Sequence, residues 1–180
     1  MSDNSISIVS RLSEHPDPIK RARDVLEWLV ARDIVKPELS DCILGAEGGY
    51  GVSAGAAAVT ENPEFVPDYL TVNGLEIITQ RQVFHTGELG MEEVICPHCG
   101  VNVAEDNWDF LDEWGGNISN NITCPTCNNI SEIHTYQFSR VWGFSNLGFT
   151  FWNWPSFTEA FINEFQQKLG VGVDVVYCRI

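Results

Sequence analysis

The segments Cys96-Pro97-His98-Cys99-Gly100 and Cys124-Pro125-Thr126-Cys127-Asn128 repeat one pattern, C-P-x-C followed by a residue that tolerates positive φ. Each segment places two thiols on a short turn, and two such turns can supply the four ligands of a tetrahedral zinc site. A single C-x-x-C pair would also suit a redox-active dithiol, whereas the repetition favours metal. Four thiolate ligands leave no position for water, so the sequence predicts one structural Zn²⁺ bound by Cys96, Cys99, Cys124 and Cys127.

The residues around each cysteine pair favour a hairpin. The apolar, extended segments Val94-Ile95 and Ile122-Thr123 precede the two pairs. Gly100 and Asn128 let the backbone fold back, so that N–H groups can point at the sulfurs. Residues 93–140 therefore resemble the zinc-ribbon family, in which two such knuckles at the tips of β-hairpins hold one zinc ion. The resemblance implies a fold for this segment and is silent on activity. With four cysteines available, we expect His98 to face solvent.

Acidic residues are concentrated around the cysteine region. The formal net charge of the chain is −15 at pH 7, and no Lys or Arg occurs between Arg81 and Arg140, although nine Asp and Glu residues do. Such a surface repels phosphate backbones and attracts basic proteins. Six acidic and aromatic residues before the second knuckle are candidates for binding a partner: Asp106, Trp108, Asp109, Asp112, Glu113 and Trp114. The alternative for the aromatic residues is that they pack this loop onto the rest of the protein.

Helical and strand-like patterns precede the cysteine region. Apolar residues recur at helical spacing from Asp17 to Asp33, with Asp17 placed to cap the helix and Pro18 at its first position. Farther along, the dipeptide Asn73-Gly74 separates two β-prone runs, which predicts a β-hairpin with a tight turn.

A second helix is predicted near the C-terminus. Ser156 and Glu159 form an S-x-x-E capping pattern, and Gly170 stands where a helix would end in a left-handed residue. Four apolar residues fall at four-residue spacing between them, namely Phe157, Phe161, Phe165 and Leu169. The β-branched run 171–180 then predicts a final strand that enters a sheet.

Together these elements predict an α+β fold: an antiparallel sheet built on hairpins, with an inserted zinc ribbon, an N-terminal helix and a C-terminal helix and strand. We divide the chain into an N-terminal part (1–92), the ribbon (93–140) and a C-terminal strand-helix-strand part (141–180) that completes the first. The segment from Gly148 to Pro155 resembles a C-terminal signature of uncharacterised bacterial zinc-ribbon proteins. That resemblance implies no established activity.

Enzyme motifs in the chain are weak. Gly51-Val52-Ser53-Ala54-Gly55 matches the G-x-S-x-G pattern of hydrolases, but that motif needs a strand before the serine, and the preceding residues are rich in glycine. A turn among small residues is the simpler interpretation of this stretch. The overlapping G-x-G-x-x-A pattern from Gly49 lacks an evident βαβ frame. Cys42 and Cys178 are single, and we expect both to be small buried side chains.

We therefore predict a non-enzymatic protein with no catalytic residues, which binds a basic protein partner through its acidic surface. One version is an immunity or antitoxin protein that blocks a cationic toxin. The alternatives are a small hydrolase that uses Ser53, and a zinc-ribbon regulator of nucleic acid whose Arg11, Lys20, Arg21, Arg23 and Arg32 would have to gather on one face. No stretch approaches the ~20 apolar residues that span a bilayer, and the start of the chain lacks a secretory pattern. We expect a cytoplasmic location.

Overall fold

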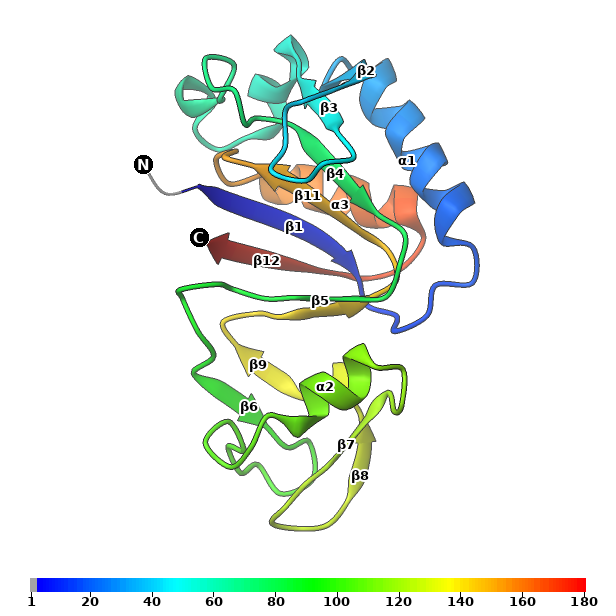
Figure 1. Cartoon of the computed structure of the whole chain (residues 1–180), viewed down its shortest axis with the longest axis vertical. Helices are drawn as coiled ribbons and strands as arrows, with labels where there is room; N and C mark the ends of the chain where they lie inside the picture. Colours follow the sequence, from blue (N-terminus) through cyan, green and yellow to red (C-terminus); the bar gives the residue numbers. More distant parts are fainter. Residues whose placement is uncertain (1–2) are drawn as a thin grey trace.

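The computed structural model describes residues 3–180, and its largest element is a six-stranded sheet (Figure 1). The strands lie in the order β12-β1-β11-β4-β3-β2, and all neighbouring pairs are antiparallel. Their bounds are β1 Asn4–Ser10, β2 Val35–Ser40, β3 Gly49–Val52, β4 Leu75–Ile78, β11 Gly148–Trp152 and β12 Val173–Arg179. This arrangement confirms the predicted α+β fold with an antiparallel sheet and the predicted final strand.

Two helices, α1 (Pro18–Ala31) and α3 (Glu159–Leu169), cover one face of the sheet (Figure 1). Strand alternation turns Ile6 and Ile8 of β1 toward them, and these residues join Phe149, Leu29 and others in the main core. Asp17 caps α1 as predicted, because its side chain accepts a hydrogen bond from the backbone N–H of Lys20.

The apolar face of α3 is confirmed, but its predicted capping residue is wrong. Phe161, Phe165 and Leu169 are buried in the main core, and Gly170 ends the helix with φ 81°. The N-cap is Thr158, whose hydroxyl accepts from the N–H of Phe161 at 3.2 Å, in place of Ser156. The helix begins later than the S-x-x-E pattern suggests, because residues 156–158 pair with residues 59–61: Phe157 forms a β-bridge with Thr60, and the N–H of Thr158 donates to the carbonyl of Val59.

The hairpin predicted at Asn73-Gly74 does not form. Residues 69–72 are irregular, and β4 pairs with β11 and β3 instead of with a strand just before it. Asn73 and Gly74 both donate their N–H groups to the carbonyl of Cys42. A Cβ added at Gly74 would lie 2.2 Å from the Cys42 sulfur, so the glycine permits a close approach of two chain segments and does not serve a positive-φ turn.

The Gly- and Ala-rich stretch is more regular than its composition indicates. Gly49–Val52 forms β3, and the 3₁₀ helix η1 (Ala54–Val59) follows Ser53. The expectation of a simple turn here is therefore wrong. Glycines are tolerated in β3 because neighbouring chain fills their side-chain positions; a Cβ added at Gly49 would lie 2.4 Å from Ile43.

A second, smaller part of the molecule carries the cysteines (Figure 1). It contains three two-stranded ladders, β5–β10, β6–β9 and β7–β8, and the short helix α2 (Asp109–Gly115). The strand bounds are β5 Gln82–Phe84, β6 Glu93–Ile95, β7 Asn121–Thr123, β8 Ile130–Glu132, β9 Gln137–Ser139 and β10 Gly143–Ser145, and this part also holds the 3₁₀ turn η3 (Ile133–Thr135). Another 3₁₀ turn, η2 (Pro63–Phe65), lies against η1 in the larger part. A separate apolar core that includes Phe110, Trp114, Ile122 and Phe144 holds this part together.

Arg81 and Trp114 join the two parts. The indole N–H of Trp114 donates to the Ser13 hydroxyl at 2.9 Å. The Arg81 guanidinium lies 3.8 Å from the centre of the Trp114 ring, and its Nε donates to the Trp114 carbonyl. No helix within residues 3–180 combines the length and the apolar character needed to cross a bilayer.

Candidate metal centre

The four predicted ligands meet at one point. The sulfur of Cys96 lies 3.8 Å from that of Cys127, and the sulfur of Cys99 lies 3.7 Å from that of Cys124. All four sulfurs lie within 4.8 Å of one another. A tetrahedron with Zn–S bonds of about 2.3 Å has S···S edges of about 3.8 Å, whereas a disulfide brings two sulfurs to about 2.05 Å. The spacing therefore fits a single tetrahedral metal ion.

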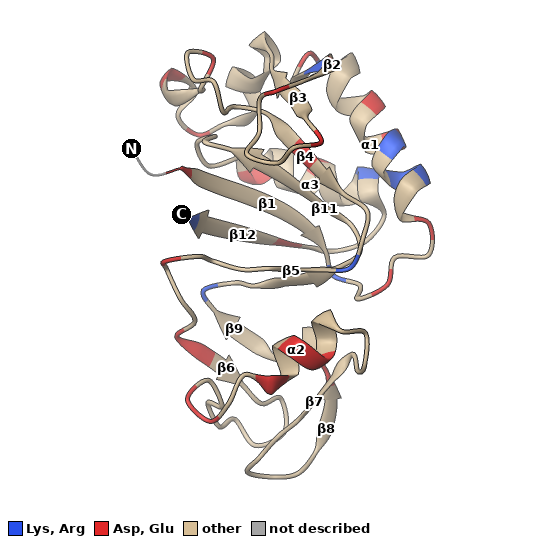
Figure 2. Ribbon diagram, viewed as in Figure 1, with Lys and Arg blue, Asp and Glu red and all other residues tan. Residues whose placement is uncertain are grey.

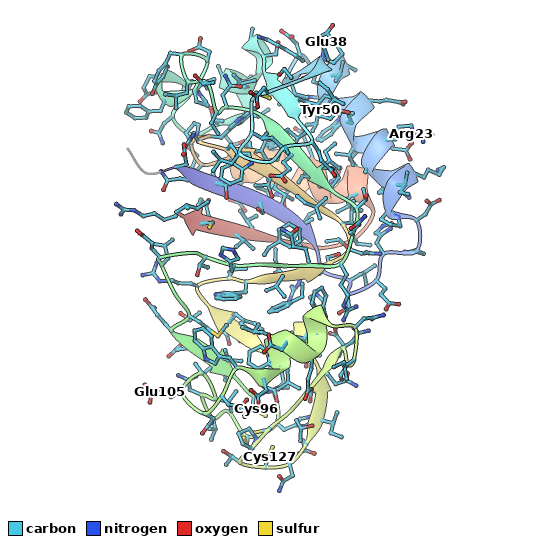
Figure 3. All side chains as sticks on the ribbon, viewed as in Figure 1. Arg23, Glu38, Tyr50, Cys96, Glu105 and Cys127 are labelled. Carbon is cyan, nitrogen blue, oxygen red and sulfur yellow. The ribbon has the colours of Figure 1, made fainter. Side chains whose placement is uncertain are left out.

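Both knuckles are built in the same way. The N–H of Gly100 donates to the carbonyl of Cys96, and the N–H of Asn128 donates to the carbonyl of Cys124. These turns require positive φ, and Gly100 and Asn128 have φ of 71° and 59°, as predicted. In Figure 3, Cys96 lies close to the Cys127 tip, at the end of the molecule opposite Glu38.

Hydrogen-bond donors point at the sulfurs from outside the ligand set. The backbone N–H of His98 donates to the Cys96 sulfur at 3.4 Å, and the side-chain amide of Asn129 donates to the Cys127 sulfur at 3.3 Å. Such donors stabilise thiolates and orient them toward a metal. His98 itself is exposed, as predicted.

Thiol ionisation at this site requires a cation. Burial alone would raise the pKa of Cys96, but N–H donation from the backbones of Cys99 and His98 lowers it to about 6. For Cys99, the Val101 backbone N–H acts to lower the pKa, yet burial and the three neighbouring sulfurs raise it to about 12. Four sulfurs this close would not all lose their protons without a neighbouring cation, and a divalent metal bound here would supply that charge.

Tyr136 provides an independent test of whether a metal fits. Its side chain is 4% exposed, and its hydroxyl is buried without a hydrogen-bond partner in the described chain. Burial and the neighbouring Cys96 raise the pKa of Tyr136, so the hydroxyl keeps its proton. A buried hydroxyl without an acceptor is costly, and a metal-bound Cys96 thiolate is a suitable acceptor. The surroundings therefore fit a metal-bound site.

Two of the ligands are also core residues. Cys96 and Cys124 are buried in the same apolar cluster as Phe110 and Trp114, while Cys99 is exposed. A metal ion here would link both knuckles to that cluster. Because all four positions are cysteines, none is left for a substrate or an activated water.

The acidic candidates lie at exposed positions in the same smaller part of the molecule. Asp106, Asp109, Asp112 and Glu113 are exposed on α2 and on the loop that precedes it. Figure 2 shows acidic residues on α2 and on the loops of this end, whereas Lys and Arg gather along α1. Trp108 is 43% exposed. Trp114 is 1% exposed, so it is not available on the surface, and the alternative of packing describes it: its indole N–H reaches Ser13 of the larger part.

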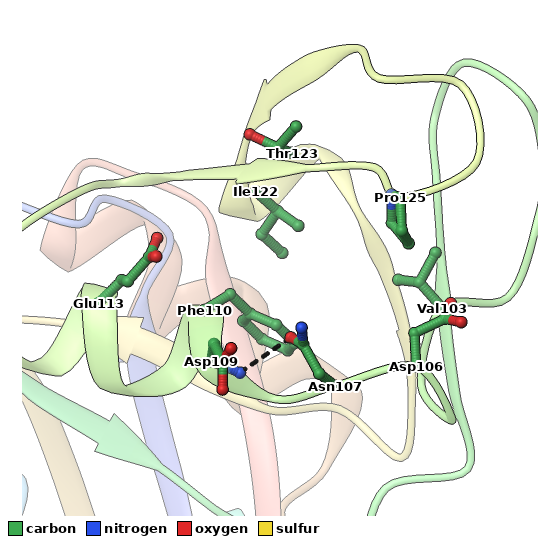
Figure 4. Close-up of a pocket in the computed structure, with 9 residues that line it drawn as sticks. All are labelled: Val103, Asp106, Asn107, Asp109, Phe110, Glu113, Ile122, Thr123 and Pro125. Carbon is green, nitrogen blue, oxygen red and sulfur yellow. Dashed lines mark hydrogen bonds between the residues drawn. The ribbon is translucent and has the colours of Figure 1, made fainter.

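A hollow lies between α2 and the second knuckle (Figure 4). It has a volume of about 200 Å³, and its lining combines buried apolar side chains with exposed carboxylates. The lining residues are Val103, Asp106, Asn107, Asp109, Phe110, Glu113, Ile122, Thr123 and Pro125. This hollow was not predicted from the sequence, because helix α2, which forms one of its walls, was not predicted. The four-residue spacing of Phe110 and Trp114 was the available signal for that helix.

Ser53 does not have the partner that a hydrolase needs. Its hydroxyl donates to a carboxylate oxygen of Asp33 at 2.6 Å. Within residues 3–180, no histidine forms a hydrogen bond with Ser53. The structure thus gives the hydrolase alternative no support, although a strand and a 3₁₀ helix do flank the serine.

A cysteine and a histidine that sequence reasoning left isolated are neighbours. The Cys178 sulfur lies 3.9 Å from Nδ1 of His85, in a hollow of about 230 Å³ on the sheet face opposite α1 and α3. Nδ1 already accepts from the backbone N–H of Gly87 at 3.0 Å. Burial raises the pKa of Cys178, and a protonated thiol is a poor nucleophile. Cys42 is buried as well, so both single cysteines are the buried side chains that were predicted.

The basic residues that a nucleic-acid regulator would need are mostly paired with acids. Arg11 lies 3.4 Å from Asp174, and Arg32 contacts Glu164. On α1, Lys20 and Arg21 both approach Asp24, at 3.6 and 3.9 Å. These pairs reduce the positive potential that phosphate binding requires.

In comparisons with models of known protein families, with curated proteins and with solved structures, nothing matches this chain.

Proposed function

We propose that this chain is a non-enzymatic binding protein, stabilised by one structural zinc ion, whose acidic end engages a basic protein. The observation that carries the proposal is a group of unneutralised carboxylates beside the metal centre. Of the nine acidic residues between Arg81 and Arg140, Glu88 and Glu92 form ion pairs with arginines, and Glu132 is hydrogen-bonded to His134. The other six form no ion pair with the described residues, and we call them the acidic face: Glu93, Glu105, Asp106, Asp109, Asp112 and Glu113.

The metal centre strengthens this negative potential. Four thiolates and one Zn²⁺ sum to a charge of −2. The second knuckle lies at the tip of the β7–β8 hairpin and a single bridge between Ile95 and Asn102 closes the first, which supports a zinc-ribbon arrangement. Zinc at such a site contributes folding energy and holds the acidic face in place. A rigid patch of one charge sign accelerates encounter with an oppositely charged partner.

Nucleic acid is not the partner under this proposal, since phosphate groups would meet the same carboxylates. A narrower form of the proposal is an immunity or antitoxin role, in which the acidic face covers the cationic active site of a toxin. Small acidic inhibitors can mask such sites electrostatically.

The experiment compares two charge-reversed proteins as bait in native cells. The first carries Asp109→Lys, Asp112→Lys and Glu113→Lys; the matched control carries Glu38→Lys, Glu47→Lys and Glu61→Lys, which are exposed positions on the larger part of the molecule. The partner that wild-type protein retains is identified, and its association rate is measured against salt.

We expect a basic partner whose association slows in the first variant and much less in the control, with the difference shrinking as salt rises, because screening acts over about 8 Å at physiological ionic strength. Equal rates for both variants would refute the proposal, as would tight binding of DNA or RNA by the wild-type protein at ~0.15 M salt.

A further inference from the structure

We infer that the hollow between α2 and the second knuckle receives one long basic side chain, lysine or arginine, of the protein partner. This inference rests on the proposed function and makes it more specific: it names the point on the acidic face where a partner residue inserts. Figure 4 shows the residues that define the hollow.

The size of the hollow suits one side chain. Its volume of about 200 Å³ is below the roughly 300–1,000 Å³ of sites that enclose a drug-sized ligand or cofactor. It is nevertheless several times the ~30 Å³ that one water molecule occupies in the liquid. The hollow therefore fits a protruding side chain better than it fits a small-molecule substrate or a single water.

The lining of the hollow matches the two chemical halves of a basic side chain. Its apolar part includes the buried side chains of Val103, Phe110 and Ile122. Carboxylates of Asp109 and Glu113 stand at exposed positions around it, and Figure 4 shows both on the same stretch of α2. Lysine and arginine bury an alkyl stem along apolar surface while their charged ends stay near water and carboxylates.

No basic group of the described chain occupies this place. The nearest basic residues in sequence are Arg81 and Arg140, and both are engaged elsewhere. Arg81 stacks on Trp114 and donates to its carbonyl, and Arg140 donates to Glu92 at 3.0 Å. The carboxylates of the hollow are thus complementary to a cation that must come from another molecule.

The lining is also held in position before any partner arrives. The side-chain oxygen of Asn107 accepts from the N–H of Asp109 at 3.1 Å, which fixes the first turn of α2 (Figure 4). Phe110 packs against Phe138, with ring centres 6.3 Å apart, and Ile122 is buried in strand β7. A preorganised site avoids part of the entropy cost of binding.

The test uses isotope-labelled, zinc-loaded full-length protein and two small probes, Nα-acetyl-arginine amide and its uncharged counterpart Nα-acetyl-citrulline amide. Amide chemical shifts are followed by NMR during titration. We expect the arginine probe to shift the signals of Asn107, Phe110 and Thr123 in a saturable manner, and the citrulline probe to shift them far less. Equal shifts with both probes would overturn the inference.

Substitutions that each remove one carboxylate charge distinguish binding in the hollow from attraction by the overall negative potential of the acidic face. Asp109→Asn and Glu113→Gln should each weaken binding of the arginine probe about two- to fivefold, as expected for the loss of one exposed ion pair. Asp112→Asn removes the same charge from the same helix but does not line the hollow, and it should have the smaller effect. If Asp112→Asn weakens binding of the arginine probe as much as Asp109→Asn does, the probe is attracted only by the long-range negative potential, and the hollow is not a binding site. That outcome leaves the proposed function intact, since partner capture depends on the whole acidic face.

Discussion

Truncation of Phe165 tests the packing on which the fold depends. Phe165 is completely buried, with ring centres 5.1 Å from Phe149, 5.8 Å from Trp28 and 5.9 Å from Phe161. Phe165→Ala therefore removes a ring that joins α1, α3 and the sheet. Substitutions of this kind in protein cores cost about 3–5 kcal/mol, because the lost contacts add to the cost of the cavity left behind.

Such a loss would be a large fraction of the stability of the chain. The free energy of unfolding of a protein domain is typically about 5–15 kcal/mol. Each kcal/mol lost from it lowers the melting temperature of a chain of this size by about 2–4 °C. We therefore expect Tm to fall by roughly 6–20 °C, measured by thermal and urea unfolding of zinc-loaded protein.

The matched control is Phe65→Ala, the same substitution at a side chain that is 61% exposed. It should change the free energy of unfolding by no more than about 0.5 kcal/mol. Near-wild-type melting of Phe165→Ala would refute the reasoning, because it would mean that the apolar face of α3 is not buried against the sheet.

Two further predictions concern single polar groups. Tyr136→Phe should lower zinc affinity about tenfold, measured by competition with a chelator, because it removes the buried hydroxyl that a metal-bound Cys96 thiolate would accept from. Unchanged affinity, with exposed Tyr69→Phe as the control, would contradict this role. Asp174→Asn should raise Tm at pH 7. Burial raises the pKa of Asp174 despite Arg11, so the folded chain binds this proton more tightly than the unfolded chain, and stability falls as pH rises through the raised pKa. The gain from Asn should shrink as pH drops toward 4, and a lower Tm at pH 7 would show that the Arg11 ion pair outweighs burial.

Local patterns with a direct physical cause could be predicted from the sequence. The cysteine spacing and the turn-forming Gly100 and Asn128 act within a few residues, and the structure brings the four sulfurs together as expected. The same holds for the Asp17 cap and for the buried face of α3. Each of these features depends on neighbours in sequence, which a pattern can report.

Features set by long-range contacts could not be predicted in the same way. Strand β1 lies inside the sheet, although its Ser5-Ile6-Ser7-Ile8 alternation was the only signal for it. Asn73-Gly74 matches a hairpin turn locally, but its N–H groups bind Cys42, which lies some thirty residues earlier in the chain. The burial of Trp114 depends in the same way on Ser13 and Arg81, which come from distant segments.

The direct test of the central claim is the zinc content of the full-length protein, purified without chelator and measured by elemental mass spectrometry alongside its Cys124→Ser variant. Cys124 is fully buried and its sulfur lies 3.7 Å from that of Cys99, so its loss breaks the ligand set. We predict one zinc ion per wild-type chain and a large loss of zinc in the variant, with destabilisation of the metal-bearing part because structural zinc contributes folding energy. Wild-type protein without metal, or a variant that keeps a full equivalent of zinc, would contradict the account.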